Sequence, residues 1–269
     1  MSNIIIDNHI HTNNSRDSFY SFASMCNEAI NKGVSIITIT DHCEVNEYIE
    51  EGYDKSIRNS IKEINEAKEM FHNQIEVLAG IELGQAIQDI SAANDILKIE
   101  NVDFILASVH NIKNMDDFYY MNYKEDTVYN ILDIYFDEIL KVIEWGNFDS
   151  LAHLTYPLRY ILRNSSINID ISRCYNHIDI ILKALVNNKK ALEINTSGLR
   201  QQINTTLPNL DIIKRFRQFG GEFITIGSDA HKPEDIGKGI KEGISVAKEA
   251  GFSCITVYRN REPHRIEID

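Results

Sequence analysis

The chain repeats one hydrophobic pattern: a short run of mostly apolar, β-branched residues is followed by a longer segment whose apolar positions recur every three or four residues. The first pattern is typical of a buried strand and the second of an amphipathic helix. Strands are predicted at 4–7, 34–40, 75–83, 103–110, 149–154, 191–197 and 222–230. Helices are predicted at 21–33, 56–71, 91–100, 127–146, 175–188 and 207–220, with a further helix and a short final strand within 240–260. This alternation predicts consecutive β/α units around a parallel sheet.

Polar residues gather where the predicted strands end. The strand ends read IIIDNHIH, TITDHCE, AGIELG, LASVHN, LAHLTYP, EINTSG and TIGSDAH. In a β/α barrel the C-terminal ends of the strands form the active-site face, so residues far apart in the chain meet at one mouth. The pattern therefore favours an α/β barrel over an open sheet, with the active site at these strand ends.

Length and composition agree with a single barrel domain over residues 1–269. A β/α barrel takes about 250 residues, and the chain has 269, with only four prolines and neither a Pro/Gly/Ser-rich linker nor an internal repeat. The 40 acidic side chains outnumber the 27 basic ones, which gives a net charge of −13. Such a balance argues against a dedicated nucleic-acid-binding protein, whose surface is usually basic.

No targeting or membrane signal is recognisable. The N-terminus, MSNIIIDNHIH, lacks the basic start and long apolar run of a signal peptide, and no run approaches the roughly 18 apolar residues of a membrane span. A cytoplasmic location without a membrane partner is expected. The four cysteines are scattered without CxxC spacing, so neither a disulfide framework nor a cysteine zinc site is indicated. The pattern does not predict an oligomeric state.

Metal-ligating residue types are concentrated at the strand ends. Alternate residues of a strand face the same side, so His9 and His11 could share a metal ion, although such a pair alone could equally be hydrogen-bonded histidines. Imidazole and carboxylate ligands suit zinc, iron and manganese. The full set predicts a metal centre: six of the nine histidines (His9, His11, His42, His110, His153, His231) lie at strand ends together with Asp17, Asp41, Glu82 and Asp229.

The series HxH, TDH, GIE, SVH, AH and GSDAH, in this order, resembles the polymerase and histidinol phosphatase (PHP) superfamily of metal-dependent phosphoesterases. The TNNSRD, HLTYPLR and INTSGLR segments resemble its L-histidinol phosphate phosphatase branch, and the similarity extends over essentially the whole chain. The resemblance implies a distorted (β/α)7 barrel with three divalent metal ions. It also implies hydrolysis of L-histidinol phosphate to L-histidinol and inorganic phosphate, a step of histidine biosynthesis.

The resemblance also implies a ligand set. His9, His11, Glu82 and Asp229 would hold the first metal, Glu82 would bridge to a second held by His110 and His153, and Asp17, His42 and His231 would hold the third. Several relatives have histidine where this chain has Asp17, a departure that bears on metal preference at the third site. Zinc, manganese and iron all remain open.

Paired metals suit phosphoester hydrolysis. They lower the pKa of a bridging water, so that hydroxide can attack phosphorus in line, and they clamp the phosphoryl oxygens. The leaving alcohol needs a proton, which could come from water or from Asp229 or Asp17 with their neighbours His42 and His231. Asp41 could either support a metal ligand or cap the following turn.

Two arginines are candidate phosphate ligands. A planar guanidinium suits bidentate contact with phosphate, and the resemblance implies this role for Arg159 and Arg200. Ser197 could donate to the phosphate or shape its turn. Arg163, one helical turn after Arg159, is expected to lie outside the site.

The segment 111–126 is long, aromatic and acidic, and is expected to act as a lid. Histidinol carries an imidazole and an ammonium group. The candidates for stacking on the ring are Phe118, Tyr119 and Tyr120, and those for meeting the amine are Asp116, Asp117 and Glu44.

Two alternative functions are compatible with part of these observations. The same fold and metals could serve a nucleoside monophosphate, a cyclic phosphodiester or an oligonucleotide end. A non-catalytic metal-binding or regulatory module is a further alternative, but a complete ligand set argues against it. A small phosphomonoester remains the favoured partner.

Overall fold

Seven parallel strands, hydrogen-bonded in the order of the chain, form the centre of the protein. The computed structural model describes residues 4–163 and 167–268. The strands are β1 (Ile6–Ile10), β2 (Ile36–Glu44), β3 (Glu76–Gly84), β4 (Phe104–Ser108), β5 (Ser150–Leu151), β6 (Ala191–Asn195) and β7 (Ile224–Gly227). All seven predicted strands are confirmed, with ends shifted by a few residues. The predicted distorted (β/α)7 barrel is therefore confirmed.

The barrel closes between β1 and β7 at their C-terminal ends. The backbone N–H of His11 donates to the carbonyl of Ala230 over 2.9 Å, and that of Asp229 donates to the carbonyl of His9 over 2.9 Å. The buried Asp7 carboxylate of β1 accepts from the backbone N–H of Ser228 (2.8 Å) and of Gly237 (2.9 Å). These bonds fix the chain after β7 against the end of β1, where the predicted ligands lie.

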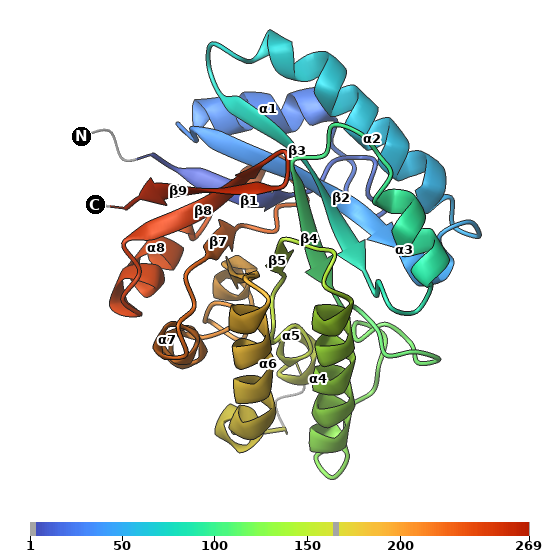
Figure 1. The fold of residues 1–269 in the computed structure, drawn as a ribbon, viewed down its shortest axis with the longest axis vertical. Helices are drawn as coiled ribbons and strands as arrows, with labels where there is room; N and C mark the ends of the chain where they lie inside the picture. Colours follow the sequence, from blue (N-terminus) through green and yellow to red (C-terminus); the bar gives the residue numbers. More distant parts are fainter. Residues whose placement is uncertain (1–3, 164–166, 269) are drawn as a thin grey trace.

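Helices lie outside the sheet (Figure 1). They are α1 (Phe22–Asn31), α2 (Tyr53–Ala67), α3 (Ile90–Ile96), α4 (Val128–Trp145), α5 (Leu158–Ile161), α6 (Tyr175–Asn187), α7 (Leu210–Gln218) and α8 (Ile240–Glu249). Short 3₁₀ segments lie at Val45–Glu47, Lys68–Met70, Ile171–Cys174, Ser197–Arg200 and Pro233–Asp235. The four-residue α5 was not predicted, because it is too short to show a helical period. Within the described residues, no helix combines the length and apolar character that a membrane crossing requires.

Helix α1 illustrates how the sequence places these helices. Its N-cap is Ser21, whose side chain accepts from the backbone N–H of Ser24. Phe22, Met25, Cys26 and Ala29 recur at three- and four-residue spacing and are the buried side chains of the helix. The main hydrophobic core lies between such helix faces and the strands.

A C-terminal hairpin lies across the opposite end of the barrel. Its strands are β8 (Cys254–Arg259) and β9 (Glu262–Glu267), which pair antiparallel. The Arg259 guanidinium binds Glu76 at the start of β3 over 2.6 and 2.7 Å, and the Tyr258 hydroxyl donates to the carbonyl of Asp149, just before β5, over 3.2 Å. Only one final strand was predicted, because β9 is exposed, charged and without an apolar run. The hairpin leaves the C-terminal end of the barrel as the face for a site.

Candidate metal centre

Nine side chains predicted as metal ligands converge at the C-terminal ends of the strands. The ligand atoms of eight of them form overlapping groups of three, and within each group all atoms lie within 4.8 Å of one another. The ninth, Asp17, adjoins the group of His11, His42 and His231, with its Oδ2 3.0 Å from His231 Nε2. His9 lies in β1, His42 in β2 and Glu82 in β3. The others directly follow strands or lie in the loop after β1: His11, Asp17, His110, His153, Asp229 and His231. The barrel thus brings together residues up to 222 positions apart, from 231 − 9.

Around His9 and His11, two carboxylates lie close to both imidazoles. Glu82 Oε2 lies 3.2 Å from His9 Nε2 and 3.5 Å from His11 Nε2. Asp229 Oδ1 lies 3.8 Å from His9 Nε2 and 3.6 Å from His11 Nε2. Ligand atoms about 2.0–2.2 Å from a zinc ion in a tetrahedron stand roughly 3.3–3.6 Å apart. His9, His11 and Asp229 therefore form one candidate ligand group, and Glu82 adjoins both of its histidines.

The other two groups adjoin the first. The second oxygen of Glu82, Oε1, lies 3.1 Å from His110 Nε2 and 3.0 Å from His153 Nε2. Asp17 Oδ2 lies 3.0 Å from His231 Nε2 and 3.6 Å from His42 Nε2. Glu82 therefore directs one oxygen into each of two neighbouring groups, the geometry that a bridging carboxylate requires.

The imidazole nitrogens themselves point to a cation. Among the described residues, the Nε2 atoms of His11 and His231 are buried and make no hydrogen bond, although Asp17 Oδ2 lies 3.0 Å from His231 Nε2. Their rings stack with centroids 4.0 Å apart, and the rings of His11 and His42 stack at 4.3 Å. Buried polar atoms without partners are rare in proteins, and a coordinated ion would satisfy these. The donor set of imidazoles and carboxylates thus fits divalent zinc, iron or manganese.

The buried carboxyl groups of the centre are held in their charged form. Burial alone would raise the pKa of Glu82, but the imidazoles of His42, His9 and His110 hold it well below its usual range. Burial would likewise raise the pKa of Asp229, but the Arg159 guanidinium and the His9 imidazole hold that pKa well below the usual range. Ionised carboxylates are the form that binds metal.

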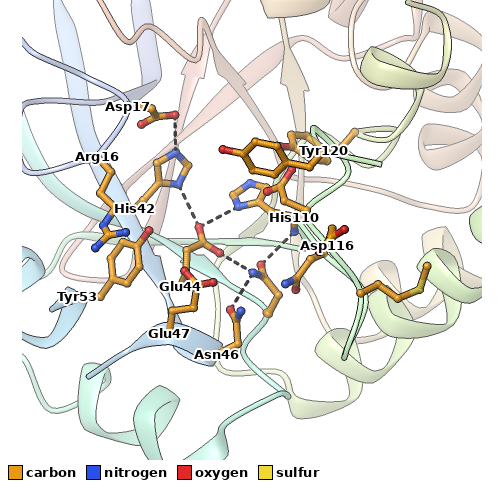
Figure 2. A pocket seen from close by; sticks show the side chains of 15 residues that line it. Arg16, Asp17, His42, Glu44, Asn46, Glu47, Tyr53, His110, Asp116 and Tyr120 are labelled. Carbon is orange, nitrogen blue, oxygen red and sulfur yellow. Dashed lines mark hydrogen bonds and ion pairs between the residues drawn. The ribbon is translucent and has the colours of Figure 1, made fainter. Parts of the chain in front are cut away.

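Two cavities open on either side of these groups. The first, of about 580 Å³, includes Asp17, His42 and His110 in its wall, and five of its lining residues are acidic. These acidic residues are Asp17, Glu44, Glu47, Asp116 and Asp117. Figure 2 shows Asp17, His42, Glu44 and His110 turned toward one another, with Tyr120 and Asp116 beside His110. This cavity suits a cationic or neutral group.

The second cavity has the opposite character. Its volume is about 500 Å³, and Asp229 and His231 lie in its wall. Four of its lining side chains are cationic (Arg159, Arg200, Lys232 and Lys238) and two are acidic (Asp229 and Asp235), so cations predominate. The metal-ligand groups therefore lie between an acidic cavity and a basic one, and a phosphate dianion would be attracted to the basic side.

The two predicted phosphate ligands meet at Asp229. Arg159 Nη2 donates to Asp229 Oδ2 over 2.8 Å and to Ser197 Oγ over 2.7 Å. Arg200 Nη2 donates to the backbone carbonyl of Asp229 over 3.3 Å. Arg159 Nε and Arg200 Nη1 are buried donors without a partner among the described residues. Both arginines line the basic cavity, where Arg200 Nε also lies 3.6 Å from Asp235 Oδ2, and each has one N–H without a protein partner, as an anion-binding group requires.

Residues 7–197 match the PHP domain family. The chain belongs to this family. It is 30% identical to a histidinol-phosphatase of Lactococcus lactis over 261 residues, covering 94% of each chain. It is also 29% identical to a probable histidinol-phosphatase of Clostridium acetobutylicum over 255 residues, covering 94% of this chain and 96% of the relative.

The PHP barrel also matches a solved structure. A crystal structure of histidinol phosphate phosphatase from Lactococcus lactis, in complex with zinc, L-histidinol and phosphate, superimposes with a TM-score of 0.81. The two chains are 26% identical, and the match covers 96% of this chain and 98% of the other. Fold and family thus agree with the resemblance found in the motifs.

Several polar residues that support this PHP site were missed at the sequence level. Glu193 Oε1 lies 2.7 Å from His9 Nδ1, and Glu44 Oε1 lies 2.9 Å from His110 Nδ1. Gln85 accepts from the backbone N–H of His110 over 3.0 Å. Glu44 had been considered only as a partner for the amine. Glu193 could have been identified as a candidate because it is a polar residue near the end of a predicted strand, in the segment ALEIN.

Asp41 binds the loop after β1 and does not cap the turn that follows it. Its carboxylate accepts from the backbone and the hydroxyl of Thr12, over 2.6 and 2.7 Å, and from Ser15 Oγ over 2.7 Å. Ser15 Oγ in turn lies 3.2 Å from His11 Nδ1. Because the serine proton goes to Asp41, Ser15 accepts from His11 and leaves Nε2 of that ring free for a metal. Asp41 therefore fixes the loop after β1 and supports His11 through it.

The remaining substrate candidates divide between the cavity and the rim. Tyr120, Asp116 and Asp117 line the acidic cavity. Phe118 is fully buried, with its ring 5.3 Å from that of Tyr135, so it does not reach the cavity. Tyr119 instead packs with Arg163, whose guanidinium lies 5.0 Å from its ring centroid. Neither Arg163 nor Tyr119 is among the residues that line the two cavities, as predicted for Arg163.

Proposed function

We propose that this chain is a metal-dependent phosphatase that hydrolyses L-histidinol phosphate to L-histidinol and inorganic phosphate, a step of histidine biosynthesis. The observation that carries the proposal is the pair of oppositely charged cavities on the two sides of the ligand groups. L-Histidinol phosphate has a dianionic phosphate at one end and an ammonium group and an imidazole at the other. The full-length similarity to histidinol-phosphatases supports the same substrate.

In this proposal, the nine ligands hold three divalent ions. His9, His11, Glu82 and Asp229 would hold the first; Glu82, His110 and His153 the second; and Asp17, His42 and His231 the third. Zinc is present in the related structure, and manganese or iron would suit the same donors. When bound, the ions lower the pKa of water and offset negative charge on the phosphoryl oxygens.

Arg159 and Arg200 bind the phosphate in this proposal. Each keeps a buried N–H without a partner among the described residues, and a guanidinium retains its charge throughout the physiological pH range. Ser197 donates its hydroxyl proton to Asn195 Oδ1 over 2.6 Å and accepts from Arg159. The serine therefore contributes to substrate binding by holding Arg159 at the cavity.

The alcohol portion of the substrate would occupy the acidic cavity. Glu44, Asp116 and Asp117 would attract the ammonium group, and Tyr120 would contact the imidazole. Asp17 lines this cavity, and 59% of its side chain is exposed. We place delivery of a proton to the leaving oxygen on this side, from water that enters the cavity, because Asp17 Oδ2 belongs to the third ligand group and the imidazoles of His42 and His231 hold the pKa of its carboxyl below the usual range.

The proposal extends to the setting of the enzyme. Residues 1–269 would act as one catalytic domain in the cytoplasm on a small phosphomonoester, without a nucleic-acid partner. Three divalent ions add 3 × 2 = 6 charges and change the net charge of −13 to −7. Because these positive charges lie at the C-terminal ends of the strands, an acidic protein can still attract a phosphate to this site.

Complementation tests this function in the cell. A bacterial strain that lacks histidinol-phosphatase and needs histidine should grow without it when it expresses this chain. Expression of the Glu82→Gln variant should leave the strain dependent on histidine, because the bridging carboxylate is lost. If soluble wild-type protein failed to restore growth, the proposed function would be wrong.

A further inference from the structure

Strand β6 carries two buried polar residues that belong to none of the ligand groups. Glu193 is 1% exposed and Asn195 is 0% exposed. As residues i and i+2 of a strand, their side chains face the same side. We propose that Glu193 and Asn195 are positioning residues. They form one hydrogen-bond network that links the ligands His9 and Asp229 to Arg159. The role given to Arg159 rests on the proposed function.

Glu193 fixes which nitrogen of His9 faces the ligand group. Its Oε1 lies 2.7 Å from His9 Nδ1, while its Oε2 accepts from the backbone N–H of His153 over 2.8 Å. A neutral imidazole has a single N–H. Donation of that proton from Nδ1 to Glu193 leaves the Nε2 lone pair directed at Glu82 and Asp229.

The charge of Glu193 also requires a partner. Within residues 4–163 and 167–268, its only ion-pair contact is His9. Burying a carboxylate without compensating charge is costly. A divalent cation bound to His9 Nε2 would make the ring more positive and so offset the negative charge of Glu193. Glu193 is therefore placed to strengthen metal binding at the first group.

Asn195 extends this hydrogen-bond network toward the basic cavity. Its Nδ2 donates to Glu193 Oε2 (3.2 Å) and to Asp229 Oδ2 (3.3 Å). Its Oδ1 accepts from the backbone N–H and the hydroxyl of Ser197, over 3.0 and 2.6 Å. Ser197 and Asp229 are the two groups that receive Arg159 Nη2. Asn195 thus holds both acceptors of the arginine.

The neighbouring strand leaves room for this arrangement. A Cβ on Gly227 of β7 would overlap the Cβ of His9 and lie 2.6 Å from Glu193 Oε1. The absence of a side chain at position 227 therefore permits the close contact between His9 and Glu193.

Metal affinity tests the role of Glu193. Zinc binding would be measured by competition with a chromogenic chelator, together with zinc content per chain, for wild type, Glu193→Gln and Glu193→Asp. Glu193→Gln should bind zinc 10- to 100-fold more weakly at one site, the usual cost of losing such a supporting group. Glu193→Asp, which keeps the charge but retracts it, should fall between the two.

Asp149→Asn is the matched control. Asp149 is a buried carboxylate at the opposite end of the barrel, where it pairs with Arg261 and accepts from the backbone N–H of Ile105 over 2.7 Å. This variant should lower Tm but keep zinc affinity within threefold of wild type. Wild-type zinc affinity in Glu193→Gln would refute the proposal, as would an equal loss of affinity in Asp149→Asn.

Binding of inorganic phosphate tests the role of Asn195. Asn195→Ala in the zinc-loaded protein should raise the Kd for inorganic phosphate, measured by calorimetry, about tenfold, while the zinc content stays at the wild-type value. Unchanged phosphate affinity, or loss of zinc, would refute this part. Neither assay uses L-histidinol phosphate, so a failure of the proposed substrate can be distinguished from a failure of the positioning role.

Discussion

Replacing Arg159 by alanine removes a buried guanidinium from the wall between the ligand groups and the basic cavity. Arg159 Nη2 donates to Asp229 and Ser197, and its Nε is a buried donor without a partner among the described residues. Its guanidinium also lies 5.0 Å from the ring centroid of Tyr156, which orients its plane. The substitution therefore removes one fixed cation from the proposed phosphate position.

The expected loss follows from the burial of this group. Removing one preorganised donor from a developing oxyanion costs about 2.7–4 kcal/mol, or roughly 10²–10³ in rate. Arg159→Ala should lower kcat/KM for L-histidinol phosphate by that factor. Arg159→Lys keeps the charge without the planar fork, so it should lose less, about tenfold.

The assay is steady-state release of phosphate, with zinc content measured on the same samples. Arg163→Ala is the matched control, because Arg163 packs on Tyr119 and Tyr160 rather than in the cavity, and its kcat/KM should stay within threefold of wild type. A change below threefold in Arg159→Ala would refute the phosphate-binding role. Loss of zinc from this variant would show instead that Arg159 supports the metal ligand Asp229.

Three further predictions address other parts of the account. Removal of metal with a chelator should abolish phosphatase activity and lower Tm, and zinc should restore both; activity that survives complete chelation would exclude metal catalysis. Asp116→Asn should raise KM for L-histidinol phosphate about three- to tenfold through weaker attraction of the ammonium group, and an equal rise for a phosphomonoester without an amine would contradict that role. Gly227→Ala should cost about 1–3 kcal/mol in urea unfolding, because the new Cβ overlaps His9; stability equal to wild type would show that the strands adjust freely.

Much of the site could be predicted because its residues coincide with strand ends. In a parallel barrel every strand ends at the same face, so His42, Glu82 and His110 could be grouped without knowledge of their distances. The strand ends themselves follow from apolar runs that are interrupted by polar residues. The ligand positions therefore depend on local patterns that a single sequence displays.

The supporting residues depend instead on contacts across strands. Glu193 meets His9 over 184 positions, and Asn195 meets Asp229 over 34. Which nitrogen, oxygen or backbone N–H each group receives is set by the relative positions of β1, β6 and β7 in the closed barrel. No spacing along the chain expresses that geometry.

The separation of charge was also invisible in the sequence. The loop 111–126 was predicted as an acidic and aromatic lid, but only the folded chain shows that Phe118 is buried while Asp116 and Tyr120 line the cavity. The net charge of −13 conceals a basic cavity formed by side chains from separate segments of the chain. Net charge averages over the surface, whereas binding depends on its local distribution.

Phosphate release by the purified, zinc-loaded protein tests the central claim most directly. kcat/KM would be measured for L-histidinol phosphate beside a nucleoside monophosphate, a cyclic phosphodiester and single-stranded DNA. The paired acidic and basic cavities predict a preference for L-histidinol phosphate of about tenfold over the nucleoside monophosphate, which has the same phosphate but no ammonium group, since roughly 1.4 kcal/mol corresponds to a factor of ten. The preference should be about a hundredfold over the cyclic phosphodiester and the DNA, whose internal phosphodiesters lack the dianionic phosphate as well. Equal or faster hydrolysis of any of the other three would contradict the account.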